Sequence, residues 1–219
     1  MYFKTSIAKK QIVAITGFLL ILFIITHLGG NLFIYAGPAV FNSYAHKLHS
    51  LGPLLLIPRV LLFLIFMVHI FVVHILVIQN FKARGGFKRY AIDKSVGDRS
   101  LAERLMTWSG IYIFVFVIFH IFDFARADVT GPRSFLYGKS YGIYGIVFNS
   151  FRDPVHGVLY ILAVCFLGLH LSHGFQSTLQ TCGFRPKWEG VIKKCSDIFA
   201  LLMVIGFSSI PVYVYWLSH

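Results

Sequence analysis

Six histidines stand inside long apolar runs of this 219-residue chain, where ionisable side chains are unusual. Imidazole binds metals through a ring nitrogen and exchanges protons near neutral pH, so both kinds of chemistry are open to it. One buried histidine could simply bond to a neighbouring helix. Ionisable residues in membrane-spanning segments nevertheless mark function by default, and four separate runs together favour a shared role. The six are His27, His69, His74, His120, His170 and His173.

The elements that position these histidines are predicted to be membrane-spanning helices. Hydrophobic residues make up 57% of the chain, whereas ordinary soluble proteins have about 45 to 50%. Each uncharged run has at least 18 residues, and a helix of that length extends about 27 Å, enough to cross the apolar core of a bilayer. The sequence therefore predicts an all-α integral membrane protein in which residues 1–219 form a single domain. Five transmembrane helices are expected at about 11–35, 54–80, 104–125, 154–181 and 196–217, with histidines on the first four.

The distribution of charge predicts the orientation of the helices. The chain has 20 basic and 8 acidic residues, a formal net charge of +12. The basic residues flank apolar runs instead of forming one stripe, so no nucleic acid is expected as a partner. Of the 20, 14 lie before the first helix, between the second and third, or between the fourth and fifth, all on one side. The positive-inside rule makes that side cytoplasmic, with the amino terminus inside and the carboxyl terminus outside.

The first and third helices carry histidines at one level. His27 is 17 residues past Lys10 and His120 is 16 past Arg104, so both are expected about 25 Å above the cytoplasmic edge. Two imidazoles that bind one iron from opposite faces of an upright porphyrin must lie at similar depths. We therefore expect His27 and His120, called the outer histidine pair below, to share an iron.

The second and fourth helices carry histidines at a lower level. His69 is 11 residues before Asn80, and His170 is 11 residues before Thr181. Both are expected about 16 Å above the same edge. We call His69 and His170 the inner histidine pair and expect it to hold a second iron.

His74 and His173 are interpreted as residues that pack beside or behind these ligands. His74 follows His69 by five residues, which turns it about 140° around the helix. His173 follows His170 by three residues and lies one turn further along the same side. An inner pair made of His74 and His173 remains an alternative, but their depths match less well.

The acidic residues indicate what crosses the membrane. None of the eight lies in the middle of an expected span. Proton pumps and ion-coupled transporters commonly keep carboxylates along their path. The sequence therefore favours electron transfer over ion transport as the function of the chain.

Two small-residue pairs repeat at the same distance from the outer histidines. Thr16-Gly17 lies ten residues before His27, and Ser109-Gly110 lies ten residues before His120. Small residues in membrane helices allow close packing of neighbouring helices. They would equally make room for a flat ring, and the sequence leaves both interpretations open.

Several short motifs follow one another in an order that resembles one family. Singly they are weak, but together they extend over nearly the whole chain. They resemble the di-haem cytochrome b membrane anchor of succinate dehydrogenases and fumarate reductases, in its single-polypeptide, five-helix type. The motifs are Thr-Gly then His27-Leu-Gly-Gly-Asn31, Phe41-Asn-Ser-Tyr-Ala-His46, His69 with Asn80 and Ala83-Arg84, Ser-Gly then His120, and His170-Leu-Ser-His-Gly-Phe-Gln-Ser-Thr-Leu-Gln-Thr-Cys-Gly183.

The resemblance implies two haem b groups with two axial histidines each. His27 and His120 match the ligands of the distal haem, and His69 and His170 match those of the proximal haem. In relatives the fourth ligand stands four residues before the glycine that matches Gly174, which favours His170. His173 is kept as the alternative inner ligand.

The resemblance also implies the activity and the partners. The chain is expected to carry electrons between menaquinone or menaquinol and an iron-sulfur subunit, as part of a succinate:menaquinone or menaquinol:fumarate oxidoreductase in a bacterial-type inner membrane. A flavoprotein with FAD and an iron-sulfur protein would dock on the cytoplasmic side and perform the dicarboxylate chemistry. The basic inner loops suit such docking, and equally suit anionic lipid headgroups. The sequence leaves open the direction of the reaction and whether the complex dimerises.

Relatives handle menaquinone near the distal haem, and the matching region here contains Asn42, His46, His49 and Arg59. Quinol oxidation releases protons, and histidine is a suitable base. His46 and His49 are therefore candidate proton acceptors, and Asn42 and Arg59 candidate contacts of quinone or haem propionate. An ordinary interfacial role is an equal alternative for each.

Arg126 and Arg152, near the outer ends of the third and fourth helices, could likewise pair with haem propionates. Extension of these side chains to the membrane surface is the alternative. One relative has a membrane glutamate where this chain has Gly168, so a proton path there is not expected.

Two other functions compete with this interpretation. The b-type cytochrome of a formate dehydrogenase, hydrogenase or nitrate reductase also has intramembrane histidine pairs, and its partner enzymes would distinguish it. A haem-free membrane transporter is the second alternative, and an absorption spectrum would separate it from any cytochrome.

Overall fold

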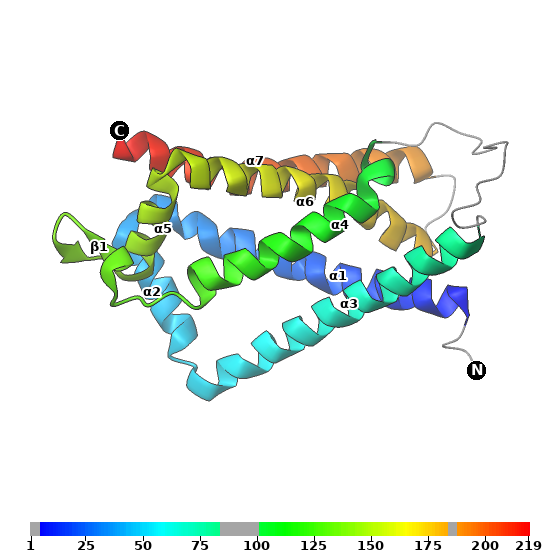
Figure 1. The fold of residues 1–219 in the computed structure, drawn as a ribbon, viewed down its shortest axis with the longest axis horizontal. Helices are drawn as coiled ribbons and strands as arrows, with labels where there is room; N and C mark the ends of the chain where they lie inside the picture. Colours follow the sequence, from blue (N-terminus) through cyan, green and yellow to red (C-terminus); the bar gives the residue numbers. More distant parts are fainter. Residues whose placement is uncertain (1–4, 84–100, 184–187) are drawn as a thin grey trace.

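Five long helices make up most of the computed structural model, which describes residues 5–83, 101–183 and 188–219. In the described part of the chain, all five are long and apolar enough to cross a membrane, which confirms the prediction of an all-α, multi-pass membrane protein. The basic segments 84–100 and 184–187, expected to face partner subunits or lipid headgroups, lie outside the described residues. The five are α1 (Ser6–Asn31), α3 (Leu56–Ala83), α4 (Leu101–His120), α6 (Pro154–Thr181) and α7 (Glu189–Ser218) (Figure 1).

The helix ends follow local capping chemistry. The α6 helix occupies the expected residues because the Asp153 carboxylate caps it, accepting a hydrogen bond from the Val155 backbone N–H, and Pro154 fits its first turn. The α7 helix begins at Glu189, before the expected residue 196. The apolar pattern did not predict this earlier start because the first turns of α7 are polar and lie outside the apolar run. The α4 helix ends at His120 and continues as the π-helix η4 (Ile121–Ala125).

Two short helices occupy segments that the sequence left as connections. They are α2 (Gly37–His49) and α5 (Gly142–Arg152), and in Figure 1 both lie at the end of the bundle that also holds the carboxyl terminus. The turn signals at Gly37-Pro38 and Gly52-Pro53 are confirmed: both glycines have positive φ, +84° and +54°, which favours glycine. The remaining short elements are η2 (Leu32–Ala36), η3 (Gly52–Leu55), η5 (Pro132–Ser134) and the antiparallel strands β1 (Phe135–Leu136) and β2 (Lys139–Ser140).

The α6 helix is at the centre of the packing. It packs against α7, α4 and α1, and α1 also packs against α3. Glycine makes the closest approaches possible: a Cβ atom at Gly168 would collide with Val204 of α7, and one at Gly206 would lie 2.7 Å from Leu28 of α1. A glutamate at position 168 would therefore have to displace α7.

The larger hydrophobic cluster lies at the end of the bundle that holds α2, α5 and the carboxyl terminus, where Ile34, Phe41, Tyr144 and Val214 are buried together with their neighbours. The α3 and α4 helices contribute little to it. The described residues of the two helices include three buried ones, Val72, Ala102 and Ser109. Large parts of their surfaces are thus open to lipid or to a bound ligand.

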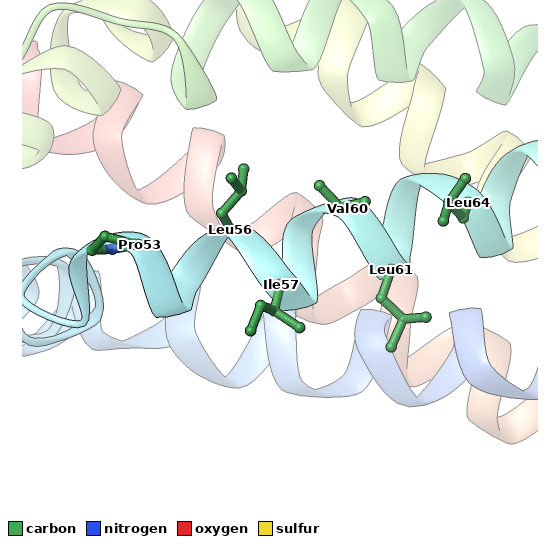
Figure 2. Close-up of a pocket in the computed structure, with 6 residues that line it drawn as sticks. All are labelled: Pro53, Leu56, Ile57, Val60, Leu61 and Leu64. Atoms are coloured by element: carbon green, nitrogen blue, oxygen red, sulfur yellow. The ribbon is translucent and has the colours of Figure 1, made fainter.

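The exposed outer half of α3 has a shallow apolar groove of about 400 Å³ (Figure 2). Every residue that lines it belongs to the chain segment leading into α3 or to α3 itself. Its surface is almost wholly apolar, so it offers no groups for catalysis or metal binding. The lining residues are Pro53, Leu56, Ile57, Val60, Leu61 and Leu64.

Candidate functional site

The structure brings the outer histidine pair together. The ring centres of His27 on α1 and His120 on α4 are 5.7 Å apart, and the ring planes are nearly perpendicular, at 88°. Two imidazoles that share one metal through nitrogens at about 2 Å have ring centres roughly 6 Å apart. The spacing of this pair therefore fits one shared metal ion.

Aromatic side chains surround this pair. Phe23 stacks on His27 at 5.2 Å between ring centres, and Phe207 of α7 lies 5.9 Å from the same ring. Phe116 and Phe124 lie 5.7 and 5.5 Å from His120. These surroundings offer His120 no polar neighbour for its Nδ1 atom, which is buried without a hydrogen bond from any described residue. A buried imidazole nitrogen left unpaired is costly, and a bound ligand would remove that cost.

His69 of the inner pair is held by a hydroxyl on the neighbouring helix. Thr16 Oγ1 on α1 lies 3.0 Å from His69 Nδ1. The Thr16 hydroxyl donates its single proton to the Ile12 carbonyl, 2.8 Å away within its own helix. With that proton donated to the carbonyl, the Thr16 hydroxyl can accept the Nδ1 proton of His69, and in this tautomer Nε2 is the electron-pair donor.

His170 is held in the same way from a different helix. Ser109 Oγ on α4 lies 3.2 Å from His170 Nδ1 and donates to the Met106 carbonyl at 3.0 Å. The same geometry allows Ser109 to accept the Nδ1 proton of His170, and in this tautomer Nε2 of His170 is the electron-pair donor. Ser109 is fully buried, so this contact is shielded from solvent.

Each hydroxyl is followed by a glycine that touches the same imidazole. A Cβ atom at Gly17 would lie 3.3 Å from His69 Cε1, and one at Gly110 would lie 3.4 Å from His170 Cε1. The distance at Gly17 is tighter than ordinary van der Waals contact and the distance at Gly110 is at its lower limit, so a side chain larger than a methyl group at either position would press on the ring. The repeated hydroxyl-glycine pair thus orients the inner histidines and keeps space beside them.

In the tautomer with the proton on Nδ1, each histidine of the inner pair has an unprotonated Nε2 that can bind a metal. Metal-bound histidines commonly donate the other ring N–H to a neighbouring acceptor, which fixes the ring and its tautomer. Within the described residues no group of three or more His, Cys, Asp or Glu could hold a metal ion, so the candidate sites are pairs.

The two remaining histidines in the spans occupy different positions. His74 is exposed on the surface of α3, away from the inner pair, as its rotation around the helix predicts. His173 is half-buried on α6, one turn after His170. The buried hydroxyl contact belongs to His170 and not to His173.

Three of the predicted quinone residues, Asn42, His46 and His49, lie on α2, and the fourth, Arg59, lies on α3. Asn42 uses both ends of its amide to join α2 to the start of α5: Nδ2 donates to the Tyr141 carbonyl at 2.8 Å, and Oδ1 accepts from the Tyr144 backbone N–H at 3.1 Å. His46 and His49 are exposed in the last turn of α2, and Arg59 is exposed near the start of α3. Asn42 thus has a structural task that leaves little of its amide for a ligand.

The two other arginines are at the outer surface. The Arg126 guanidinium lies 5.8 Å from the centre of the Phe122 ring, and the residue is exposed. Arg152 is exposed in the last turn of α5. In the described part of the chain, no hydrogen bond, ion pair or ring contact joins Arg126 or Arg152 to the outer histidine pair.

The sequence reasoning missed a group of polar side chains beside His120. Asp123 on η4 accepts a hydrogen bond from the Tyr160 hydroxyl at 2.7 Å, and its carboxylate also lies 3.2 Å from His156 Nε2 and 3.7 Å from Arg133. We call Asp123, Arg133, His156 and Tyr160 the outer polar cluster. Two spacings in the sequence were the available signal: Asp123 follows His120 by three residues, and His156 precedes Tyr160 by four.

Comparisons of this chain with protein-family models, with curated proteins and with solved structures give no match.

Proposed function

We propose that this chain is a di-haem cytochrome b, the membrane-anchor subunit of a succinate:menaquinone or menaquinol:fumarate oxidoreductase. It would transfer electrons between menaquinone in the bilayer and an iron-sulfur subunit. That subunit and a flavoprotein would dock at the cytoplasmic ends of the helices, where most of the basic residues lie. The complex would reside in a bacterial-type inner membrane with the amino terminus inside.

The arrangement of the inner histidine pair is the observation that carries this proposal. His69 and His170 come from different helices, and the Nδ1 atom of each lies within hydrogen-bond distance of a hydroxyl on yet another helix. If both rings donate from Nδ1, four helices together orient two rings whose Nε2 atoms are electron-pair donors. A structural histidine needs one satisfied contact, whereas this arrangement prepares two rings for a metal.

The residues present fit haem. Haem b, when bound, supplies an iron that accepts and releases single electrons. His69 and His170 would hold one haem, with Gly17 and Gly110 keeping space beside the rings. His27 and His120 would hold the other among aromatic side chains.

The placement of acidic residues supports electrons over ions as the transported species. Asp123 is at the outer end of α4 and η4, and Asp197 is in the first half of α7, where its carboxylate accepts from the Ser172 hydroxyl. No carboxylate among the described residues lies midway along a predicted span. Ion-coupled transporters usually need one there.

The direct test is purification in mild detergent, followed by a reduced-minus-oxidised absorption spectrum and mass spectrometry of co-purified subunits. We expect the spectrum of two b-type haems, with a flavoprotein and an iron-sulfur protein as partners. A colourless preparation from cells with ample haem would refute the cytochrome assignment. A molybdenum or nickel enzyme as partner would instead show a formate dehydrogenase, nitrate reductase or hydrogenase subunit.

A further inference from the structure

Oxidation of a quinol at the outer haem, a step that rests on the proposed function, requires a base. One quinol becomes a quinone by losing two electrons and two protons. Electrons can travel between cofactors, but a proton needs an acceptor within hydrogen-bond distance of the quinol oxygen. The acceptor must therefore lie beside the outer histidine pair and near the outer surface.

We propose that the outer polar cluster is this acceptor, with His156 as the catalytic residue and Asp123 as its positioning residue. The cluster lies on the side of His120 that faces the outer end of the bundle. The Tyr160 ring is 6.0 Å from the His120 ring and stacks on the His156 ring at 4.9 Å between centres. His156 is therefore close to the outer pair without contacting either of its histidines.

The Asp123 carboxylate is the centre of the cluster. It meets three groups: the Tyr160 hydroxyl and the His156 ring, both from α6, and the Arg133 guanidinium from η5. Arg133 also donates to the Asp123 carbonyl at 3.3 Å and to Ser150 Oγ at 2.7 Å, which fixes its position. These contacts hold the Asp123 carboxylate in place beside His156.

The His156 ring has one nitrogen on the carboxylate and one available for a substrate. Nε2 is buried 3.2 Å from Asp123 Oδ2, at an angle that makes an ion-pair contact and not a hydrogen bond. Nδ1 has no hydrogen-bond partner among the described residues, and 28% of the side chain is exposed. A proton that arrives at Nδ1 creates an imidazolium paired with Asp123, the arrangement by which a carboxylate supports a histidine base.

The proposed step balances as follows for one quinol. Its two electrons pass one at a time to ferric haem at the outer pair, which is the oxidant. One O–H bond breaks as its proton forms an N–H bond at His156 Nδ1, and this proton then leaves to water at the outer surface. The second O–H bond breaks in the same way once His156 is neutral again, and quinone remains. In quinone reduction the same groups deliver both protons.

The charged and titratable groups that face His156 are Asp123, Arg133 and Tyr160. Arg133 is 47% exposed and lies at the outer edge of the cluster, so water can reach it there. The cluster therefore connects the surroundings of the outer pair to the outer surface over a short distance. The exposed His46 and His49 on α2 are the alternative acceptors. The exposed His219, which follows α7, provides a matched control variant.

The test measures haem reduction by 2,3-dimethyl-1,4-naphthoquinol in the purified complex, by stopped-flow absorbance across a range of pH. Haem content is measured separately, by complete reduction with dithionite. Removing a general base typically slows the reaction by about 100-fold or more. We expect that loss in His156→Gln with full haem content, and a wild-type rate in the control variant His219→Gln. Asp123→Asn should alter the pH profile, and Asp123→Glu should restore part of the rate.

Three results would overturn the proposal. The first is a wild-type rate in His156→Gln with full haem content. The second is the large loss in His46→Gln or His49→Gln, which would assign the base to α2. The third is loss of haem in both His156→Gln and His156→Asn, which would make the cluster a structural part of the haem site. Absence of haem from the wild-type protein is a different result, because it refutes the proposed function itself.

Discussion

Replacing the buried hydroxyls of Thr16 and Ser109 tests whether they prepare the inner histidines for a metal. Thr16→Val and Ser109→Ala remove the acceptor of the Nδ1 proton but change the volume of the side chain little. A buried N–H left unpaired costs about 1 to 3 kcal/mol. Loss of such a partner behind a metal ligand typically lowers metal affinity about 10- to 100-fold, which agrees with that energy. We therefore expect haem affinity at the inner site to fall by this factor in each variant.

The assay is a redox titration of purified protein that resolves the two haems, combined with transfer of haem to an excess of a haem-scavenging apoprotein. One haem should leave faster, and its midpoint potential should rise, because a histidine without the Nδ1 hydrogen bond donates less charge to ferric iron. The matched control is Thr26→Val on the same helix, since the Thr26 hydroxyl contacts only the carbonyls of Leu22 and Phe23. Equal haem release and equal potentials in Thr16→Val, Ser109→Ala and the control would show that these hydroxyls have no part in metal binding.

Three further outcomes follow from the same geometry. Gly17→Val and Gly110→Val should eliminate the inner haem signal. The control Gly29→Val should keep both haems, because no described atom of a neighbouring element lies within 4 Å of its Cβ site. Retention of both haems in Gly17→Val and Gly110→Val would disprove the space requirement. Replacing His27 or His120 by alanine should remove one haem and replacing His69 or His170 the other, while His173→Ala should spare both, as read from difference spectra; full occupancy in any of the first four would show that the pairing is wrong. Gly168→Ala should lower the thermal unfolding temperature in detergent, because overpacking against Val204 costs about 1 to 3 kcal/mol. Adding Val204→Ala to the same chain should restore the unfolding temperature. No recovery would mean that another contact sets the distance between α6 and α7.

The sequence predicted the framework of the site because membrane depth is a linear property of a helix. Counting residues from the charged edge predicted His27 and His120 at the same depth, and in the structure their ring centres lie 5.7 Å apart. Their role as ligands stays a prediction. The count could not find the contact of Thr16 with His69, because it depends on how α1 and α3 are rotated about their own axes. Only packing fixes that rotation.

The outer polar cluster escaped prediction for a different reason. Arg133 reaches Asp123 only because the connection between α4 and α6 forms η5, a hairpin and α5, so that residues ten apart meet again. The sequence left this connection, like α2, without defined structure. Apolar periodicity predicts spans well, but short interfacial helices depend on contacts with the finished bundle, as Asn42 shows by joining α2 to α5.

The α1 and α4 helices each serve both histidine pairs, which gives the repeated small-residue motif a physical meaning. Each carries an outer histidine and, ten residues earlier, a hydroxyl-glycine pair that contacts an inner histidine on a neighbouring helix. The sequence left close packing and space for a ring as equal explanations of this repeat. In the structure Gly17 and Gly110 meet imidazoles of neighbouring helices, which is close packing, and room for a flat cofactor ring stays a prediction. One rigid helix thereby fixes the spacing between the two levels, about 15 Å for ten residues. Two metal sites so linked would keep a constant separation, which suits electron transfer between them.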